Sequence, residues 1–264
     1  MELINNLLEN SEFKEYLNNV DGTYIVLNPQ WRNILVSLSG GADSAMVLYQ
    51  LSRIITEQRL PIDIHIITNI RMWETKPWAA TVSQQVYDYF GKTFPNIRYI
   101  RHVNFIAPDI EFGRIGAIIP DKHGRMKSGC QISSRSYMEY IVATNNIDAA
   151  YDGVTLNPPL TVASDGMADR TIESLDTTSL KDTIAYIQTY DAYMISPFKF
   201  VAKDWVIKQY IDYKLLDLLD ITRSCEYEFP DMDYKTYQPG QYVPTCGKCF
   251  WCIERNWAMK KNNL

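Results

Sequence analysis

One strand–turn–helix unit constrains the fold of this chain more than any other feature. Residues 33–38 read Asn-Ile-Leu-Val-Ser-Leu, an apolar run that predicts a buried strand, and residues 43–58 have the apolar spacing of a helix. Gly40 and Gly41 make the turn between them. Glycines at such a turn can adopt positive φ and let backbone N–H groups approach an anion. The unit therefore predicts a strand of an α/β sheet followed by an anion-binding loop.

The rest of the chain repeats this alternation of strand and helix. Further strands are predicted at residues 62–70, 97–105, 147–154 and 193–200, and helices at residues 78–90, 132–145 and 204–219. Such alternation is typical of a doubly wound parallel sheet with helices on both faces.

Three stretches fall outside this rhythm. Residues 3–18 carry apolar positions at helical spacing and predict an N-terminal helix, followed by a short strand at 23–27. Residues 107–129 are rich in glycine and proline and predict a flap over the ligand edge of the sheet. Residues 156–185 predict a long loop, with one helix near 180–189.

The side chains of the glycine turn are suited to a phosphate and its metal ion. Ser39 and Ser44 offer hydroxyl donors, Asp43 can hold Mg²⁺, and the following helix start points unpaired N–H groups at an anion. The lysine of the Gly-x-x-x-x-Gly-Lys phosphate loop is absent. The alternative is an ordinary strand-to-helix turn, in which glycine and aspartate are common.

The cysteines form a second group at the C-terminal end. The chain has five, and Cys246, Cys249 and Cys252 follow one another at intervals of three, with Cys225 upstream. Four thiolates suit a closed, tetrahedral, structural zinc site, and Gly247 allows the tight turn between the first pair. An iron–sulfur cluster is the rival interpretation, because four cysteinates also suit that chemistry. Cys130 is the cysteine left over.

Composition narrows the class of protein. The formal charge of −5 weighs against non-specific nucleic-acid binding and leaves a local basic groove open. No segment approaches the roughly 20 continuous apolar residues of a membrane span, and the first residues lack a secretion signal. We therefore expect a cytoplasmic protein without a membrane partner, whose cysteines serve as ligands or thiols rather than disulfides.

The string Ser39-Gly40-Gly41-Ala42-Asp43-Ser44 is similar to the signature of the PP-loop ATP pyrophosphatases, an adenine nucleotide alpha hydrolase-like fold. The resemblance implies cleavage of ATP to AMP and pyrophosphate with Mg²⁺, and adenine binding near the end of the second strand of the sheet. Asp43, Ser39 and Ser44 are the expected catalytic residues. The residues expected to bind ATP are Ser37, Leu38, Ser39, Gly40, Gly41, Ala42, Asp43, Ser44 and Asn69.

Within that superfamily the chain most resembles the 7-cyano-7-deazaguanine synthase family of queuosine biosynthesis. The likeness is carried by five short segments: Tyr151-Asp152-Gly153-Val154, Ser196-Pro197, Lys203, Thr222-Arg223-Ser224-Cys225, and the Cys246–Cys252 run with Arg255. It implies a carbon–nitrogen ligase that converts 7-carboxy-7-deazaguanine and ammonia to the nitrile, with a four-cysteine zinc. Arg135 and Lys203 are the expected substrate contacts. The segment after the second strand, at 68–73, departs from that family.

Two other functions remain open at this point. One is a tRNA thiolase of the same superfamily, in which Cys130 carries sulfur; the other is a regulatory protein that binds ATP without cleaving it. The expected partners are ATP, a small carboxylate and, as an option, a second copy of the chain. The predicted domains are an N-terminal helical extension at 1–30, an ATP pyrophosphatase domain at 31–220 and a zinc module with a C-terminal helix at 221–264.

Overall fold

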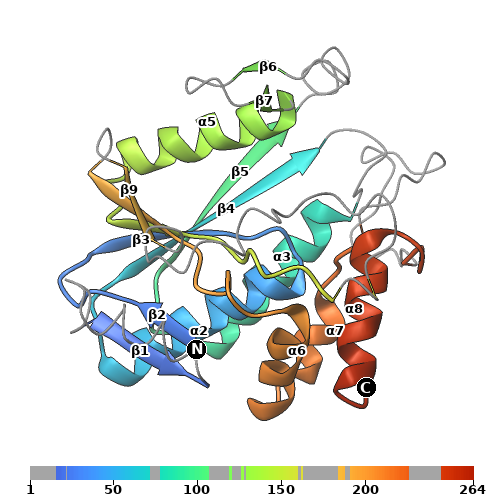
Figure 1. Cartoon of the computed structure of the whole chain (residues 1–264). Helices are drawn as coiled ribbons and strands as arrows, with labels where there is room; N and C mark the ends of the chain where they lie inside the picture. The colour runs from blue at the N-terminus through green and yellow to red at the C-terminus, as the bar shows by residue number, and fades with distance from the viewer. Residues whose placement is uncertain are drawn as a thin grey trace.

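The computed structural model of the chain describes residues 16–21, 23–71, 78–106, 119–120, 126–127, 129–159, 162, 184–187, 191–225 and 245–264. At its centre lies a six-stranded sheet. Its strands are β3 (Asn33–Ser37), β4 (Asp63–Arg71), β5 (Tyr99–Ile106), β8 (Ala149–Tyr151), β9 (Ile184–Ile187) and β10 (Ala192–Ile195). Their order is β5-β4-β3-β8-β10-β9 (Figure 1). The first five run parallel, and β9 pairs antiparallel with β10 at the edge.

Helices cover both faces of the sheet. They are α2 (Ala42–Gln58), α3 (Ala79–Thr93), α5 (Gly129–Thr144), α6 (Lys203–Asp212), α7 (Leu216–Ile221) and α8 (Phe250–Lys261). Figure 1 shows α5 on one face and the other labelled helices on the opposite face. On the α5 side, Ile141 and Val142 pack against Leu35 and Ile67 of the sheet. The predicted doubly wound parallel sheet is confirmed.

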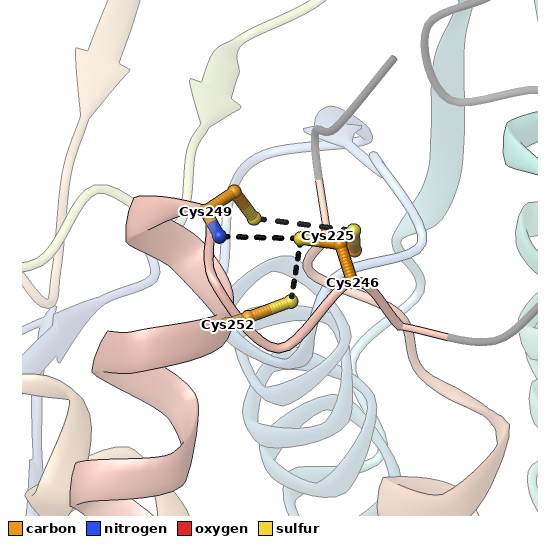
Figure 2. Close-up of side chains that lie close together, drawn as sticks. All are labelled: Cys225, Cys246, Cys249 and Cys252. Carbon is orange, nitrogen blue, oxygen red and sulfur yellow. Dashed lines mark hydrogen bonds between the residues drawn. The ribbon is translucent and has the colours of Figure 1, made fainter. Parts of the chain in front are cut away.

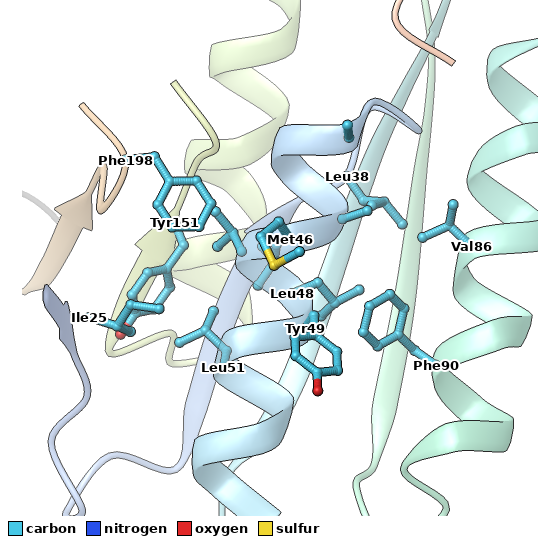
Figure 3. Close-up of a cluster of buried hydrophobic side chains, with 14 of the residues drawn as sticks. Ile25, Leu38, Met46, Leu48, Tyr49, Leu51, Val86, Phe90, Tyr151 and Phe198 are labelled. Atoms are coloured by element: carbon cyan, nitrogen blue, oxygen red, sulfur yellow. The ribbon is translucent and has the colours of Figure 1, made fainter. Parts of the chain in front are cut away.

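Helix α2 is the centre of the larger core. Its side chains Met46, Leu48 and Leu51 lie between Tyr151 on one side and Phe90 on the other, and each of these residues is fully buried (Figure 3). Burial of a large apolar side chain stabilises a fold by about 1.5–3 kcal/mol. The N-terminus of α2 is therefore held by packing along the whole helix.

The strand order reverses between β3 and β8. From β3 the chain moves outward to β4 and β5, and then returns to place β8 on the other side of β3. In open α/β sheets the crevice at such a reversal, at the carboxyl ends of the strands, is where ligands bind. Here the loops that meet at this point are residues 38–41, after β3, and residues 152–154, after β8.

The N-terminal region differs from its prediction. Residues 17–20 form β1 (Leu17–Val20), which pairs antiparallel with β2 (Thr23–Val26), so the helix expected at 3–18 is wrong for its last two residues. The pairing buries Val20 and Ile25 in the main core, and this tertiary packing outweighs the helical spacing. Residues 1–15 lie outside the described part of the chain.

Two helix predictions near the C-terminal half also need correction. The helix expected at 204–219 divides into α6 and α7, because Lys214 adopts a left-handed φ of 57° and Leu215 N–H donates to the Tyr210 carbonyl. The helix expected near 180–189 is wrong at Ile184–Ile187, which are the edge strand β9. There the backbone finds hydrogen-bond partners on β10.

Two strands are shorter than predicted for a local reason. The last predicted strand, 193–200, ends at Ile195, where Ser196 and Pro197 follow, and proline has no N–H to donate to a ladder. The strand expected at 147–154 ends at Tyr151, because Val154 N–H turns back to the Asp152 carboxylate.

Little of the expected flap at 107–129 falls in the described residues. Ile119–Pro120 (β6) and Met126–Lys127 (β7) pair as a short antiparallel ladder, and Gly129 begins α5. Most of the loop expected at 156–185 also lies outside the described ranges. Across the residues that the structure does describe, none of the helices has the length and apolar character needed to cross a bilayer.

Candidate functional site

The turn after β3 is held open by its glycines. Leu38 N–H still donates to the Ile67 carbonyl of β4, at 2.8 Å, and the backbone then leaves the sheet at Gly40 with a φ of 80°. A β-carbon on Gly40 would also lie 3.0 Å from the Val82 side chain. Both the dihedral angle and the space require glycine at this position. Gly41 is then the N-cap of α2.

Hydrogen bonds within the turn hold its serine side chains. Ser39 N–H donates to Ser44 Oγ at 3.3 Å, the two hydroxyls lie 3.2 Å apart, and Ser44 Oγ donates to the Gly41 carbonyl at 3.2 Å. Gly41 N–H donates to Ser39 Oγ at 3.3 Å. The N–H groups of the first turn of α2 have no acceptor within the helix. The loop is therefore a preformed set of donors suited to an anion.

The turn after β8 forms the opposite wall. A cleft of about 270 Å³ lies between the two turns. It is lined by Ser37, Ser39, Asp43, Ser44, Asp152, Gly153, Val154 and Trp251. Gly153 lies against the start of α2, where a β-carbon would come within 2.7 Å of Ser44 N and 2.8 Å of the Asp43 carbonyl carbon. Only glycine lets the β8 turn approach the helix start so closely.

Asp152 supplies a half-buried carboxyl group to this cleft. Its oxygens accept hydrogen bonds from Ser196 Oγ at 3.0 Å and from Val154 N–H at 3.1 Å. Burial raises the pKa of Asp152, although these two donors and the positive charge of Lys199 act in the opposite direction. Asp152 is therefore a hydrogen-bond acceptor whose position is fixed by Val154, after β8, and by Ser196, after β10.

Lys203 does not lie where the sequence suggested. Its side chain is only 1% exposed and does not line the cleft; the ammonium group bonds to Asp43 Oδ2, from behind the loop. Lys203 Nζ also lies 3.5 Å from Glu254 Oε2 on α8. The other oxygen of Asp43, Oδ1, is buried and has no hydrogen-bond partner among the described residues.

The segment that leads to Cys225 packs directly on the loop. Arg223 N–H donates to the Gly40 carbonyl at 2.9 Å, and a β-carbon on Gly41 would lie 3.8 Å from Ser224 Oγ. Arg255 of α8 anchors this segment from the other side, with one guanidinium nitrogen 2.8 Å from Thr222 Oγ1. The cysteine region and the glycine turn are therefore one continuous structure.

The four predicted cysteine ligands come together. The sulfurs of Cys225, Cys246, Cys249 and Cys252 all lie within 4.8 Å of one another and could hold a metal ion (Figure 2). Two of the sulfur–sulfur distances are 3.9 Å, and Cys249 N–H donates to Cys246 Sγ at 3.2 Å. Gly247 has a φ of 70°, as expected for the tight turn between the first pair.

The electrostatic surroundings of the four sulfurs are unequal. Burial raises the pKa of the Cys246 thiol, but hydrogen bonds with the backbone N–H groups of Lys248 and Cys249 and with the Cys249 and Cys225 side chains together lower the pKa to about 7. Burial raises the pKa of Cys252. Four thiols this close favour a bound cation, because a cation stabilises the deprotonated forms together.

The side chains of the remaining predicted site residues are not among those that line the described cleft. Leu38 is buried and Ala42 begins α2, so each would contribute backbone atoms only. Asn69 lies near the end of β4, where its side-chain oxygen accepts a hydrogen bond from Asn104 at 2.8 Å, and it does not line the described cleft. Arg135 lies on α5, and its side chain is outside the described part of the structure.

Four cleft residues were missed as site residues: Asp152, Gly153, Val154 and Trp251. The signal for Gly153 was its position after an acidic residue at the carboxyl end of a predicted strand. Trp251 also lines the cleft, but in the sequence it stands between Cys249 and Cys252, and that spacing predicts a metal site rather than a cleft residue.

Comparisons with known proteins give distant similarities. No protein-family model matches the sequence, and no curated protein matches it. Among solved structures, the chain is similar to the U34-tRNA thiolase NcsA from Methanococcus maripaludis with its [4Fe-4S] cluster. The identity is 14% and the TM-score 0.44, over 100% of this chain and 71% of that one. It is also similar to phosphoadenylyl-sulfate (PAPS) reductase from Candida auris in a phosphate complex, with 9% identity and a TM-score of 0.35, over 73% of this chain and 85% of that one.

Proposed function

We propose that this protein is an ATP pyrophosphatase of the PP-loop type, which binds ATP in the cleft and transfers AMP to a small carboxylate. The observation that carries the proposal is the loop of residues 39–44. It lies at the strand-order reversal of the sheet and combines a positive-φ glycine, two serine hydroxyls and a carboxylate, one of whose oxygens has no hydrogen-bond partner in the described part of the chain. Each of these features suits a triphosphate with its Mg²⁺.

The geometry supports a role for each loop residue. The N–H groups at the start of α2 and the hydroxyls of Ser39 and Ser44 would bind the two phosphates that leave as pyrophosphate. Asp43 Oδ1 would hold Mg²⁺, while Oδ2 stays on Lys203. A carboxylate oxygen of the substrate attacks the α-phosphorus, the bond to the β-phosphate oxygen breaks, and pyrophosphate departs with the electron pair. Bound Mg²⁺ would offset the charge on that leaving group.

The substrate we propose follows the resemblance to the 7-cyano-7-deazaguanine synthase family. Ammonia would displace AMP from the acyl adenylate to give an amide, and a nitrile requires a second activation because the amide must then lose one water. Asp152 and Trp251 are suited to a planar, N–H-bearing heterocycle, since one accepts hydrogen bonds and the other offers an aromatic face. Arg135 remains our proposed contact to the substrate carboxylate.

For the cysteine site we propose one structural zinc. With Zn–S bonds of about 2.3 Å, a tetrahedral ion spaces its sulfurs about 3.8 Å apart. The two sulfur–sulfur distances of 3.9 Å, between Cys246 and Cys252 and between Cys249 and Cys225, fit this spacing. A four-iron cluster would spread the thiolates farther, because each sulfur binds a different iron.

A tRNA thiolase is the second candidate. One observation favours it: the four thiols lie near the cleft. Trp251, which lines the cleft, lies between Cys249 and Cys252 in the sequence. Ser224, which precedes Cys225, lies next to Gly41. A redox-active or sulfur-carrying centre in this position would be close to an activated substrate. Metal analysis separates the two candidates, since iron with sulfide would favour the thiolase and one zinc per chain would favour the ligase.

The activity test is release of pyrophosphate and AMP from ATP. We would screen 7-carboxy-7-deazaguanine with ammonia, other small carboxylates, and tRNA with a sulfur donor. We expect AMP and pyrophosphate in equal amounts, and with the deazaguanine acid a nitrile product. Release of ADP and phosphate instead would contradict the proposed cleavage between the α and β phosphates.

Asp43→Asn tests the loop itself. The variant keeps the size of the side chain but weakens Mg²⁺ binding and the bond to Lys203, so we expect pyrophosphate release to fall about 10²–10³-fold, the range seen when one transition-state contact is removed. The fold should survive, because the buried Lys203 ammonium group keeps Glu254 as a carboxylate partner. Activity equal to wild type would remove Asp43 from the mechanism.

A further inference from the structure

Three charged side chains meet behind the glycine turn, each from a different helix. Asp43 is in the first turn of α2, Lys203 is the first residue of α6, and Glu254 is on α8. Lys203 Nζ bonds to Asp43 Oδ2 and lies 3.5 Å from Glu254 Oε2. Lys203 is 1% exposed and Glu254 is 0% exposed, so water does not screen this contact.

A buried charge is costly unless its partners are well placed. Removing ions from water costs several kcal/mol each, and only close partners offset that loss. Lys203 has a carboxylate on either side, and one of these, Glu254, does not reach the cleft. The second carboxylate therefore fixes where the ammonium group lies, and the ammonium group in turn fixes which oxygen of Asp43 it holds.

The consequence is visible at Asp43. Its Oδ2 is taken by Lys203, whereas Oδ1 is buried and without a hydrogen-bond partner among the described residues. A carboxylate held by one oxygen presents the other in a defined direction. That is the arrangement by which supporting residues orient a metal ligand.

We propose that Glu254 is a positioning residue for cation binding at Asp43 and acts through Lys203. This inference rests on the proposed function, because the cation is the Mg²⁺ that accompanies a nucleotide. It gives the cysteine-bearing helix a second role: α8 carries Cys252 for the metal site and Glu254 for the loop, two residues apart. Glu254 is not itself a catalytic residue, since it touches neither the cleft nor any reacting atom.

The test is nucleotide binding with and without Mg²⁺. The ligand is α,β-methylene-ATP, which cannot be cleaved at the bond in question, and affinity is measured by calorimetry. For Glu254→Gln we expect the Mg²⁺-nucleotide complex to bind about 10–100-fold more weakly, as for other residues that support a metal ligand. Binding of the nucleotide in EDTA should not change. Glu254→Asp, which keeps the charge, should recover part of the affinity.

A matched control comes from the same pair of helices. Lys261 of α8 forms an exposed ion pair with Asp204 of α6, so Asp204→Asn breaks a link between these helices away from the loop. We expect this variant to bind the Mg²⁺-nucleotide as wild type does. If Asp204→Asn weakens binding as much as Glu254→Gln, the effect is a general loosening of α8, and the inference is overturned.

A double-mutant comparison tests the route through Lys203. In a Lys203→Met background, Glu254→Gln should have no further effect on the affinity for the Mg²⁺-nucleotide, because residues that act in series are not additive. The double variant also removes both charges together, which is often tolerated in a protein core, so it serves if Glu254→Gln alone does not fold. A full additional loss in the double variant would overturn the inference. If wild-type protein fails to bind the Mg²⁺-nucleotide at all, the proposed function itself is wrong.

Discussion

The glycine turn and the cysteine cluster lie side by side, and the chain builds them differently. The turn is made of six consecutive residues whose serine hydroxyls and backbone groups bond to one another, with α2 buried behind them. The cluster joins Cys225 to the run at Cys246–Cys252, and its closest contacts are between sulfur atoms that would repel one another as thiolates. The fold therefore organises the turn by itself, whereas we expect the cluster to depend on a bound cation for its stability.

Cys249→Ser should have the largest effect and tests whether the cluster depends on a metal ion while the turn does not. Because metal-binding energy becomes folding energy, we expect the variant to lose its metal and its melting temperature to fall by about 10 °C, at roughly 2–4 °C per kcal/mol. Affinity for a nucleotide should change less than stability, since the hydrogen bonds of the turn do not involve the metal. Elemental analysis and thermal melts measure both effects.

The fifth cysteine provides the control for that experiment. We expect Cys130→Ser, on α5, to leave the metal content as it is, because the four sulfurs that meet are those of Cys225, Cys246, Cys249 and Cys252. A chelator added to wild-type protein should reproduce the Cys249→Ser shift. Full metal content in Cys249→Ser would show that the site does not need four thiolates.

Gly153→Ala should damage the turn from the β8 side. Its new methyl group would lie 2.7 Å from Ser44 N, so the backbone must shift, and such overpacking costs about 1–3 kcal/mol. Nucleotide affinity should fall along with stability, and metal content should not. Urea denaturation gives the change in the free energy of unfolding.

Gly91→Ala is the matched control for Gly153→Ala. A β-carbon at Gly91, in α3, meets nothing within 4 Å. In a helix, alanine is more favourable than glycine by about 0.5–1 kcal/mol, so this variant should be more stable than wild type. Equal behaviour of the two glycine variants would mean that the close approach at Gly153 has no special role.

Tyr210→Phe tests the smallest of the expected effects. The Tyr210 hydroxyl is buried and donates to the Ala42 carbonyl at 2.7 Å, which ties α6 to the first turn of α2. Losing this hydrogen bond should cost about 0.5–1.5 kcal/mol of stability and weaken nucleotide binding slightly. Tyr87→Phe removes a similar bond, to the Tyr99 carbonyl, and should lower stability without changing nucleotide binding.

The sequence alone determined the parts that depend on neighbouring residues. The apolar run at 33–38, the glycine pair and the helix at 43–58 predicted β3, the turn and α2, because strand period, glycine φ and helical spacing are local properties. The alternation of elements predicted the doubly wound sheet, and the spacing of the cysteines predicted that four of them would meet. The same local reasoning was wrong at residues 17–18 and 184–187, where antiparallel pairing with the next strand along the chain outweighs the helical interpretation of the sequence.

Only the tertiary structure decided what surrounds the turn. A lysine at a helix start is usually solvated, and nothing local to Lys203 shows that it is buried against Asp43, 160 residues earlier. The same holds for Glu254 and Trp251, which lie in one short helix. Glu254 reaches the Lys203 ammonium group behind the turn, and Trp251 lines the cleft in front of it. These contacts depend on how α6 and α8 pack against α2. That packing is a sum of many weak apolar contacts spread over the whole chain, and it leaves no pattern within any one segment.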